Sequence, residues 1–172
     1  MKKVIIHTDG GCHGNPGPGG WAAVLTYGPR SQILAGGALA TTNNQMELRA
    51  AIEALRALKE PCQIELFTDS VYLRSGITSW LAGWKANGWR TKGRQPVRNE
   101  ELWRELESVA SKHTIEWKWL KGHAGHAGNE QCDQLAQAEI ARIKQAHTRE
   151  ELQDALDAFR ARDADRSQPN LF

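Results

Sequence analysis

Two aspartates, Asp9 and Asp69, each follow a short run, residues 4–8 and 64–68, of the β-branched and apolar types typical of a strand. In open α/β sheets, active sites gather at the carboxyl ends of the strands. If the two strands are parallel neighbours, both carboxylates emerge at one edge of the sheet. Acids brought together in this way favour the binding of a cation.

Two further acids, Glu47 and Asp133, lie on the apolar sides of their own helices in the sequence pattern. The apolar residues at helical spacing are Ala51, Ala54 and Leu58 for Glu47, and Ala136 and Ile140 for Asp133. Burying an unpaired carboxylate is costly, so a divalent cation shared with other acids is the natural compensation. Taken singly, each acid is more readily explained as an N-terminal helix charge or a solvated strand end. That alternative is strongest for Asp133 and weakens when all four acids are considered together.

Carboxylates without a Cys or His cluster favour Mg²⁺, with Mn²⁺ as a substitute, over zinc. We expect one or two ions per site, because two ions about 4 Å apart can clamp the attacking and leaving oxygens of a phosphodiester. The three cysteines are odd in number and form no C-x-x-C pair. We therefore expect free thiols rather than a disulfide framework or a zinc site.

The elements expected to position these acids alternate between strands and helices. We expect strands over residues 4–9, 21–27, 31–40, 64–68 and 114–120, a glycine-rich loop over 14–20, and helices over 42–59, 70–80, 100–111 and 129–146. This order predicts a mixed α/β fold with one central sheet and helices packed on it. A capping box at Thr148 and Glu151 predicts one more helix, to about residue 161.

The chain has 172 residues, 40% of them hydrophobic and 24% charged, as in an ordinary globular domain. No run approaches the roughly 20 apolar residues of a membrane helix, and the first residues lack a secretory signal core. We therefore expect a cytoplasmic protein, with a monomer as the default. The net charge is only +2, but residues 70–99 hold no acid and six Lys or Arg. Such a segment predicts an anionic partner.

Five segments, in their order and spacing, resemble the bacterial ribonuclease HI family (type 1 ribonuclease H). They are Thr8-Asp9-Gly10-Gly11 with Gly14-Asn15-Pro16-Gly17, Thr42-Asn43-Asn44-Gln45-Met46-Glu47-Leu48, Thr68-Asp69-Ser70, Lys121-Gly122-His123-Ala124-Gly125-His126, and Asn129-Glu130 with Cys132-Asp133. Each motif is short, but the ordered set is specific. The resemblance implies a ribonuclease-H-like α/β fold, in which an antiparallel meander and parallel strands form a five-stranded mixed sheet flanked by helices. It implies a catalytic domain over 1–145 with a basic protrusion at about 80–98, followed by a C-terminal helical extension and flexible tail over 146–172.

The resemblance also implies an activity. A member of this family would be an endonuclease that hydrolyses the RNA strand of RNA–DNA hybrids, leaves 5′-phosphate and 3′-hydroxyl ends, and removes primers and R-loops. Asp9, Glu47, Asp69 and Asp133 would be catalytic and would bind the metal. His123, on a loop with glycines on both sides, would assist proton transfer or product release; the alternative is a surface histidine without a role. The alternative functions are a catalytically inactive hybrid-binding module and a related nuclease or integrase with the same fold.

Substrate contacts follow from the same resemblance. Short polar groups near the acids would read the 2′-hydroxyl of the RNA strand, and Thr42 would bind a DNA-strand phosphate. Trp84 would pack on a deoxyribose, and Lys and Arg of the protrusion would bind backbone phosphates, so cleavage should tolerate any sequence and weaken with salt. The matching positions are Gly11, Cys12, Asn15, Thr42, Asn43, Asn44, Trp80, Trp84, Lys85, Arg90 and Lys92. The alternatives are helix capping and turns for the Asn and Thr residues, and a local core for the tryptophans, which we favour for Trp80.

One position departs from the family: Val71 stands where many relatives carry a polar residue that contacts RNA, which puts that contact in doubt. Trp103, Trp117 and Trp119 are expected in the core.

The last five residues, Gln168-Pro169-Asn170-Leu171-Phe172, resemble the Q-x-x-L-F peptide by which many bacterial replication proteins dock on the sliding clamp. Gln168, Leu171 and Phe172 would be the clamp-binding residues, with the two apolar side chains inserted into a hydrophobic groove. The alternatives are an inert tail and packing against the protein's own core.

Overall fold

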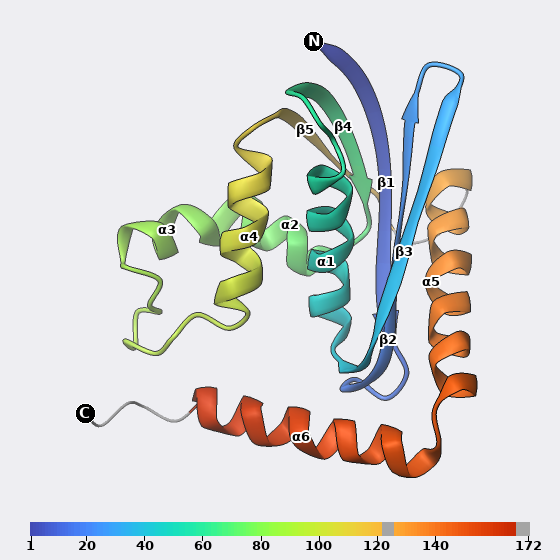
Figure 1. Cartoon of the computed structure of the whole chain (residues 1–172). Coiled ribbons are helices and arrows are strands. Elements are labelled where there is room, and N and C mark those ends of the chain that lie inside the picture. The colour runs from blue at the N-terminus through green and yellow to red at the C-terminus, as the bar shows by residue number, and fades with distance from the viewer. Residues whose placement is uncertain (122–125, 168–172) are drawn as a thin grey trace.

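Five strands form one mixed sheet in the order β3-β2-β1-β4-β5, with helices on both faces (Figure 1). The computed structural model describes residues 1–121 and 126–167. Strands β1 (Lys2–Cys12), β2 (Gly17–Tyr27) and β3 (Arg30–Thr41) form an antiparallel meander, and β4 (Cys62–Thr68) and β5 (Thr114–Trp119) extend the sheet in parallel with β1. The mixed sheet predicted from the sequence is confirmed.

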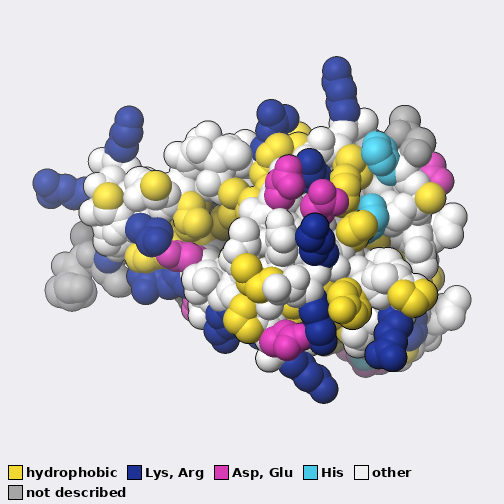
Figure 2. All heavy atoms as spheres, turned by 90° about the horizontal axis from the view of Figure 1, so that it is seen from above, with side chains coloured by type: hydrophobic (Ala, Val, Ile, Leu, Met, Phe, Trp, Pro, Cys, Tyr) yellow, Lys and Arg dark blue, Asp and Glu magenta, His cyan; other side chains and the backbone are white. Residues whose placement is uncertain are grey.

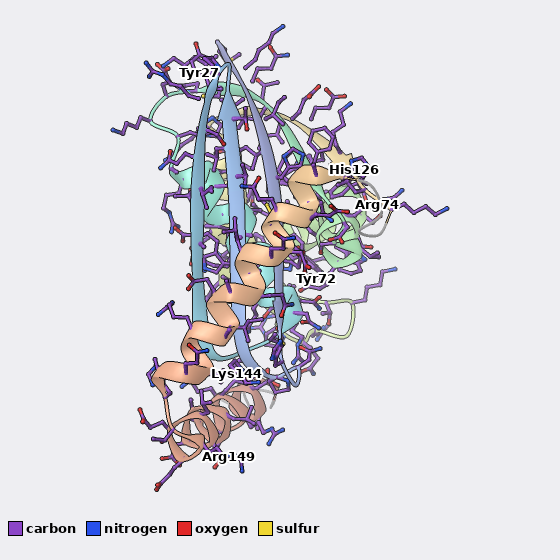
Figure 3. The ribbon with its side chains drawn as sticks, turned by 90° about the vertical axis from the view of Figure 1, so that its right-hand side faces the viewer. Tyr27, Tyr72, Arg74, His126, Lys144 and Arg149 are labelled. Atoms are coloured by element: carbon purple, nitrogen blue, oxygen red, sulfur yellow. The ribbon has the colours of Figure 1, made fainter. Side chains whose placement is uncertain are left out.

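Helices α1 (Asn43–Arg56) and α4 (Glu100–Ala110) cover one face of the sheet. Helix α5 (Ala127–Ala146) crosses the other face over β1, β2 and β3 (Figure 3). The main core lies between the sheet and the first pair of helices, where Trp103 is fully buried as predicted. Trp117 and Trp119 pack against this core half-buried and stacked at 5.8 Å.

The glycines at the start of β2 belong to the strand, so the loop predicted over residues 14–20 is wrong in its second half. A Cβ at Gly20 would collide with the carbonyl oxygen of Ala136 in α5, and one at Gly19 with the side chain of Thr41. Glycine is needed here because neighbouring backbone and side chains approach the strand closely. The sequence alone does not distinguish glycines that allow close packing of a strand from glycines that form a loop.

The segment between β4 and α4 is helical first and irregular afterwards. Helix α2 (Val71–Ser75), a π-helical turn η1 (Gly76–Trp80) and α3 (Leu81–Ala86) follow one another, which confirms the helix expected over residues 70–80. The π-helical turn lies where Gly76 faces the ring of Trp103, and any Cβ there would collide with that ring.

Helix α6 (Arg149–Ser167) follows α5 and runs beyond the predicted end near residue 161. Its capping box is confirmed, because Thr148 and Glu151 exchange hydrogen bonds of 3.1 and 3.2 Å. Figure 1 shows α6 crossing below the sheet, from the end of α5 toward the end of α1 where that helix begins. Across the described chain, no helix is both long and apolar enough to cross a membrane.

Candidate active site

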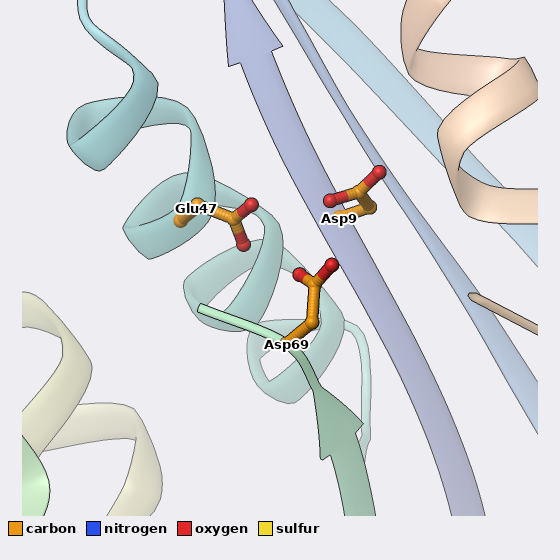
Figure 4. A group of neighbouring side chains, drawn as sticks. All are labelled: Asp9, Glu47 and Asp69. Atoms are coloured by element: carbon orange, nitrogen blue, oxygen red, sulfur yellow. The ribbon is translucent and has the colours of Figure 1, made fainter. Parts of the chain in front are cut away.

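The carboxylates of Asp9, Glu47 and Asp69 meet at one place beside the sheet (Figure 4). Each offers an oxygen, and the three oxygens lie within 4.8 Å of one another. Asp9 lies on β1 and Asp69 directly follows β4, and these strands are parallel neighbours as the sequence analysis required. Glu47 reaches the same place from α1, and it is only 8% exposed because it faces the sheet. The prediction that these three acids converge is confirmed.

The local structure holds each acid in position. Thr42 caps α1 by accepting a hydrogen bond from the Gln45 amide at 3.2 Å, which fixes the start of the helix that carries Glu47. Ser70 caps α2 in the same way, directly after Asp69. The Gly10 amide donates to Oε1 of Glu47 at 3.2 Å and joins the helix to β1.

The acids oppose one another's ionisation. Desolvation, with the charges of Asp69 and Asp133, raises the pKa of Asp9 to about 6. Burial, followed by the charge of Asp9, raises the pKa of Glu47 well above its usual range. A hydrogen bond between these two carboxyl groups lowers the pKa of Asp9 and raises the pKa of Glu47.

These residues fit a divalent cation. The buried Oε2 of Glu47 has no hydrogen-bond partner among the described residues. A buried carboxylate oxygen without a donor is costly, and a cation would compensate it. The donor set is entirely carboxylate oxygen, which suits Mg²⁺ or Mn²⁺ rather than zinc. All three cysteines are free thiols, as expected, and Cys62 and Cys132 are buried.

The two remaining catalytic candidates, Asp133 and His123, do not belong to this group of three acids. Asp133 lies half-buried on α5, outside the group of three acids, although its charge contributes to the raised pKa of Asp9. His123 lies outside the described residues. His126, the last residue of the motif that contains His123, is exposed directly before α5 and makes no capping hydrogen bond with its side chain.

Three of the expected substrate contacts form one hydrogen-bonded group. Oδ1 of Asn43 accepts from the amide of Cys12 at 2.9 Å, and Oδ1 of Asn15 accepts from the amide of Asn43 at 3.0 Å. Gly11 adjoins this group, since a Cβ there would lie 3.7 Å from Oδ1 of Asn43. These contacts support the capping and turn roles considered as alternatives, and they leave Asn43 and Asn44 exposed beside the acids.

Three aromatic side chains of the basic segment, those of Tyr72, Trp80 and Trp84, form one connected group with Trp103. The ring of Trp84 lies 5.6 Å from the rings of both Trp80 and the buried Trp103, and it is tilted by 41° relative to the ring of Trp80. The interpretation of Trp80 as a core residue is wrong, because 39% of it is exposed. Its ring contacts the rings of Tyr72 and Trp84, and its i,i+4 spacing from Trp84 is equally compatible with burial and exposure.

The charged residues of the segment are not equivalent. Lys85 forms an ion pair with Glu107 of α4, whereas Arg90 and Lys92 are exposed without a carboxylate partner among the described residues. Figure 2 shows Lys and Arg side chains projecting at the end of the molecule that carries α3, where Asp and Glu are sparse. A contact not anticipated from the sequence is the pairing of Arg98 with Asp163, 65 residues apart, which ties this segment to α6. No local pattern in the sequence identifies such a distant pair.

Comparison with known proteins agrees with this geometry. The RNase H family model matches residues 1–141. A ribonuclease H of Marinobacter nauticus is 54% identical over 144 residues, which are 84% of this chain and 98% of the relative. A ribonuclease H of Chelativorans sp. is 57% identical over 144 residues, which are 84% of this chain and 89% of the relative. Among solved structures, LC9-RNase H1, a type 1 RNase H with the type 2 active-site motif, superposes with a TM-score of 0.76 at 32% identity, covering 84% of this chain and 74% of that one. The chain therefore belongs to the RNase H family of hydrolases.

Proposed function

We propose that the protein cleaves the RNA strand of RNA–DNA hybrids endonucleolytically at Asp9, Glu47 and Asp69, with divalent cations as cofactors. The observation that carries this proposal is the convergence of these three carboxylates within 4.8 Å, with Glu47 buried and one of its oxygens lacking a donor in the described chain. Membership of the RNase H family supplies the substrate class. The products would carry 5′-phosphate and 3′-hydroxyl ends.

Asp9, Glu47 and Asp69 would hold one or two Mg²⁺ or Mn²⁺ ions, with Asp133 completing the donor set from α5. When bound, the cations supply the positive charge that activates the attacking water and stabilises the leaving 3′ oxygen. The Gly10 amide keeps Oε1 of Glu47 fixed, so the donor set needs little rearrangement. His123 would take up or deliver a proton beside this site.

Recognition of the hybrid would use two surfaces. Asn15, Asn43 and Asn44, with the backbone at Gly11 and Cys12, lie at the start of α1 and would contact the 2′-hydroxyls of the RNA strand. The DNA strand would lie against Thr42 and the protrusion, where Trp84 and the exposed face of Trp80 would pack on sugar. Lys85, Arg90 and Lys92 would bind phosphate, a contact that carries no sequence information.

Labelled RNA–DNA hybrid, double-stranded RNA and double-stranded DNA, each incubated with Mg²⁺ or with EDTA, test the proposal. The expected result is cleavage of the RNA strand of the hybrid alone, and only with metal. Asp9→Asn and Asp69→Asn should each abolish cleavage while hybrid binding survives. Binding by the wild type without cleavage would instead support the alternative of an inactive hybrid-binding module, and full activity of either variant would rule out the acid cluster as the catalytic site.

We also propose a division of the chain and a cellular role. Residues 1–145 would be the catalytic domain, acting as a monomer in the bacterial cytoplasm on primers and R-loops, and residues 146–172 would be an addition to it. Gln168, Leu171 and Phe172, which lie outside the described residues, would bind the sliding clamp. Deleting residues 168–172 should abolish clamp binding and leave hybrid cleavage unchanged; unchanged clamp binding, or none by the intact protein, would exclude this role.

A further inference from the structure

The second half of α6 lies beside the start of α1 and the end of the basic segment (Figure 1). A cavity of about 390 Å³ opens between them. Its lining includes Asn15, Thr42 and Asn44, together with Arg98 and with Arg160 and Asp163 of α6. The cavity therefore joins expected substrate contacts to a helix that begins after residue 141, where the family match ends.

Two contacts hold α6 in this position. Phe159 is the one buried side chain among residues 149–164, and its ring also lines the cavity. Nη2 of Arg98 donates to both carboxylate oxygens of Asp163, at 3.2 and 3.3 Å. Arg160, one residue after Phe159, is therefore held at the cavity by contacts on either side of it along the helix.

The charges of the cavity favour an anion. Arg160 is exposed, and no carboxylate in the described part of the chain forms an ion pair with it. The first turn of α1, beside Thr42 and Asn44, contains no acidic residue, and the start of a helix carries partial positive charge. Asp163 is the one carboxylate among the residues that line the cavity, and Arg98 already forms an ion pair with it.

We infer that α6 is part of the nucleic-acid-binding surface and that Arg160 binds a backbone phosphate of the DNA strand at this cavity, beside Thr42 and Asn44. The inference rests on the proposed function, which brings the DNA strand to Thr42. The guanidinium group supplies a charged, forked donor, and Thr42 and Asn44 supply neutral polar groups at the same cavity. The C-terminal addition would thus enlarge the binding surface of the catalytic domain.

The test measures hybrid binding by the full chain carrying Asp9→Asn, which prevents cleavage, at several salt concentrations. Arg160→Ala should weaken binding about fivefold and reduce the slope of log K against log salt concentration by about 0.9. Arg160→Lys should retain most of the affinity. The matched control is Arg149→Ala, which removes the same charge from the exposed first turn of the same helix (Figure 3) and should change neither quantity. Equal effects of Arg149→Ala and Arg160→Ala would overturn the inference.

A second measurement locates the contact. Each hybrid carries one neutral methylphosphonate in place of a phosphate of the DNA strand, and its affinity should fall where the protein contacts that phosphate. At one position this loss of affinity should be smaller in Arg160→Ala than in the Asp9→Asn parent, because Arg160→Ala has already removed the partner of that phosphate. Additive losses at every position would exclude a direct contact. If the wild-type protein fails to cut hybrid, the proposed function fails; if it cuts and Arg160→Ala binds like its parent, only this inference fails.

Discussion

The backbone amide of Gly10 donates to Oε1 of Glu47 at 3.2 Å, and this hydrogen bond joins α1 to β1 at the residue next to Asp9. A Cβ at Gly10 would lie 2.6 Å from the carbonyl oxygen of Met46 and 2.7 Å from the amide nitrogen of Glu47. Both neighbours are backbone atoms, which cannot rotate aside as a flexible side chain can. The absence of a side chain at this position therefore sets how closely Glu47 approaches Asp9.

Gly10→Ala should consequently move α1 away from β1 and separate Glu47 from the other two acids. We expect at least a hundredfold loss of hybrid cleavage, since small displacements of catalytic groups are costly. The free energy of unfolding should fall by about 1–3 kcal/mol from overpacking. The control is Gly83→Ala in α3, where a Cβ would meet nothing within 4 Å. It should leave cleavage unchanged, and comparable losses in both variants would exclude the close approach as the cause.

The raised pKa of Asp9 predicts how the stability of the metal-free protein depends on pH. Its pKa is about 6 in the folded protein and 3.8 in the absence of burial, so between these values the folded state binds the proton more tightly than the unfolded state. The contribution of Asp9 to the free energy of unfolding therefore falls as pH rises from about 4 to about 6, by at most about 3 kcal/mol, and stays low above.

Asp9→Asn removes this titration. In EDTA at pH 7.5 the variant should be more stable than the wild type, and below about pH 4 the two should unfold at the same denaturant concentration. Mg²⁺ should stabilise the wild type much more than the variant. The control is Asp154→Asn, the same substitution at an exposed position of α6. If the difference in the free energy of unfolding between the wild type and Asp9→Asn did not vary with pH, the assignment of the raised pKa to Asp9 would be contradicted.

Phe159 offers a test of how α6 is attached. Because it is the one buried side chain among residues 149–164, Phe159→Ala should detach the helix. A free helix of this length is marginal in water, so amides of α6 should lose protection from hydrogen exchange while those of β1 and α5 keep theirs. Hybrid affinity should fall about as much as in Arg160→Ala. Unchanged protection of α6 would show that Phe159 does not hold it.

Local patterns in the sequence predicted the placement of Asp9, Glu47 and Asp69, because the strand or helix that carries each acid is determined by residues close to it in the sequence. The helical spacing around Glu47 predicted its burial, and the two apolar strands predicted the meeting of Asp9 and Asp69. The patterns failed where packing between distant segments decides the structure. Gly20 lies in a glycine-rich segment typical of a loop but packs against α5. The spacing of Trp80 does not reveal that this member of the aromatic group faces water.

The basic segment allows a last prediction, which separates its paired from its unpaired charges. Lys85 already forms an ion pair with Glu107, whereas Arg90 has no carboxylate partner among the described residues. Binding a phosphate at Lys85 must compete with Glu107, so Lys85→Ala should reduce the salt dependence of hybrid binding by less than Arg90→Ala, for which we expect a slope change of about 0.9.

Glu107→Gln should act in the opposite direction, because it releases Lys85 and removes a negative charge from the binding surface. We expect hybrid affinity to rise about two- to threefold at low salt, with the gain disappearing as salt screens the charges. In the double variant with Lys85→Ala the charge effect of Glu107→Gln remains but the released lysine is absent, so the gain should be smaller. An equal gain with and without Lys85 would show that the ion pair does not limit phosphate binding, and that Glu107 acts only through its charge.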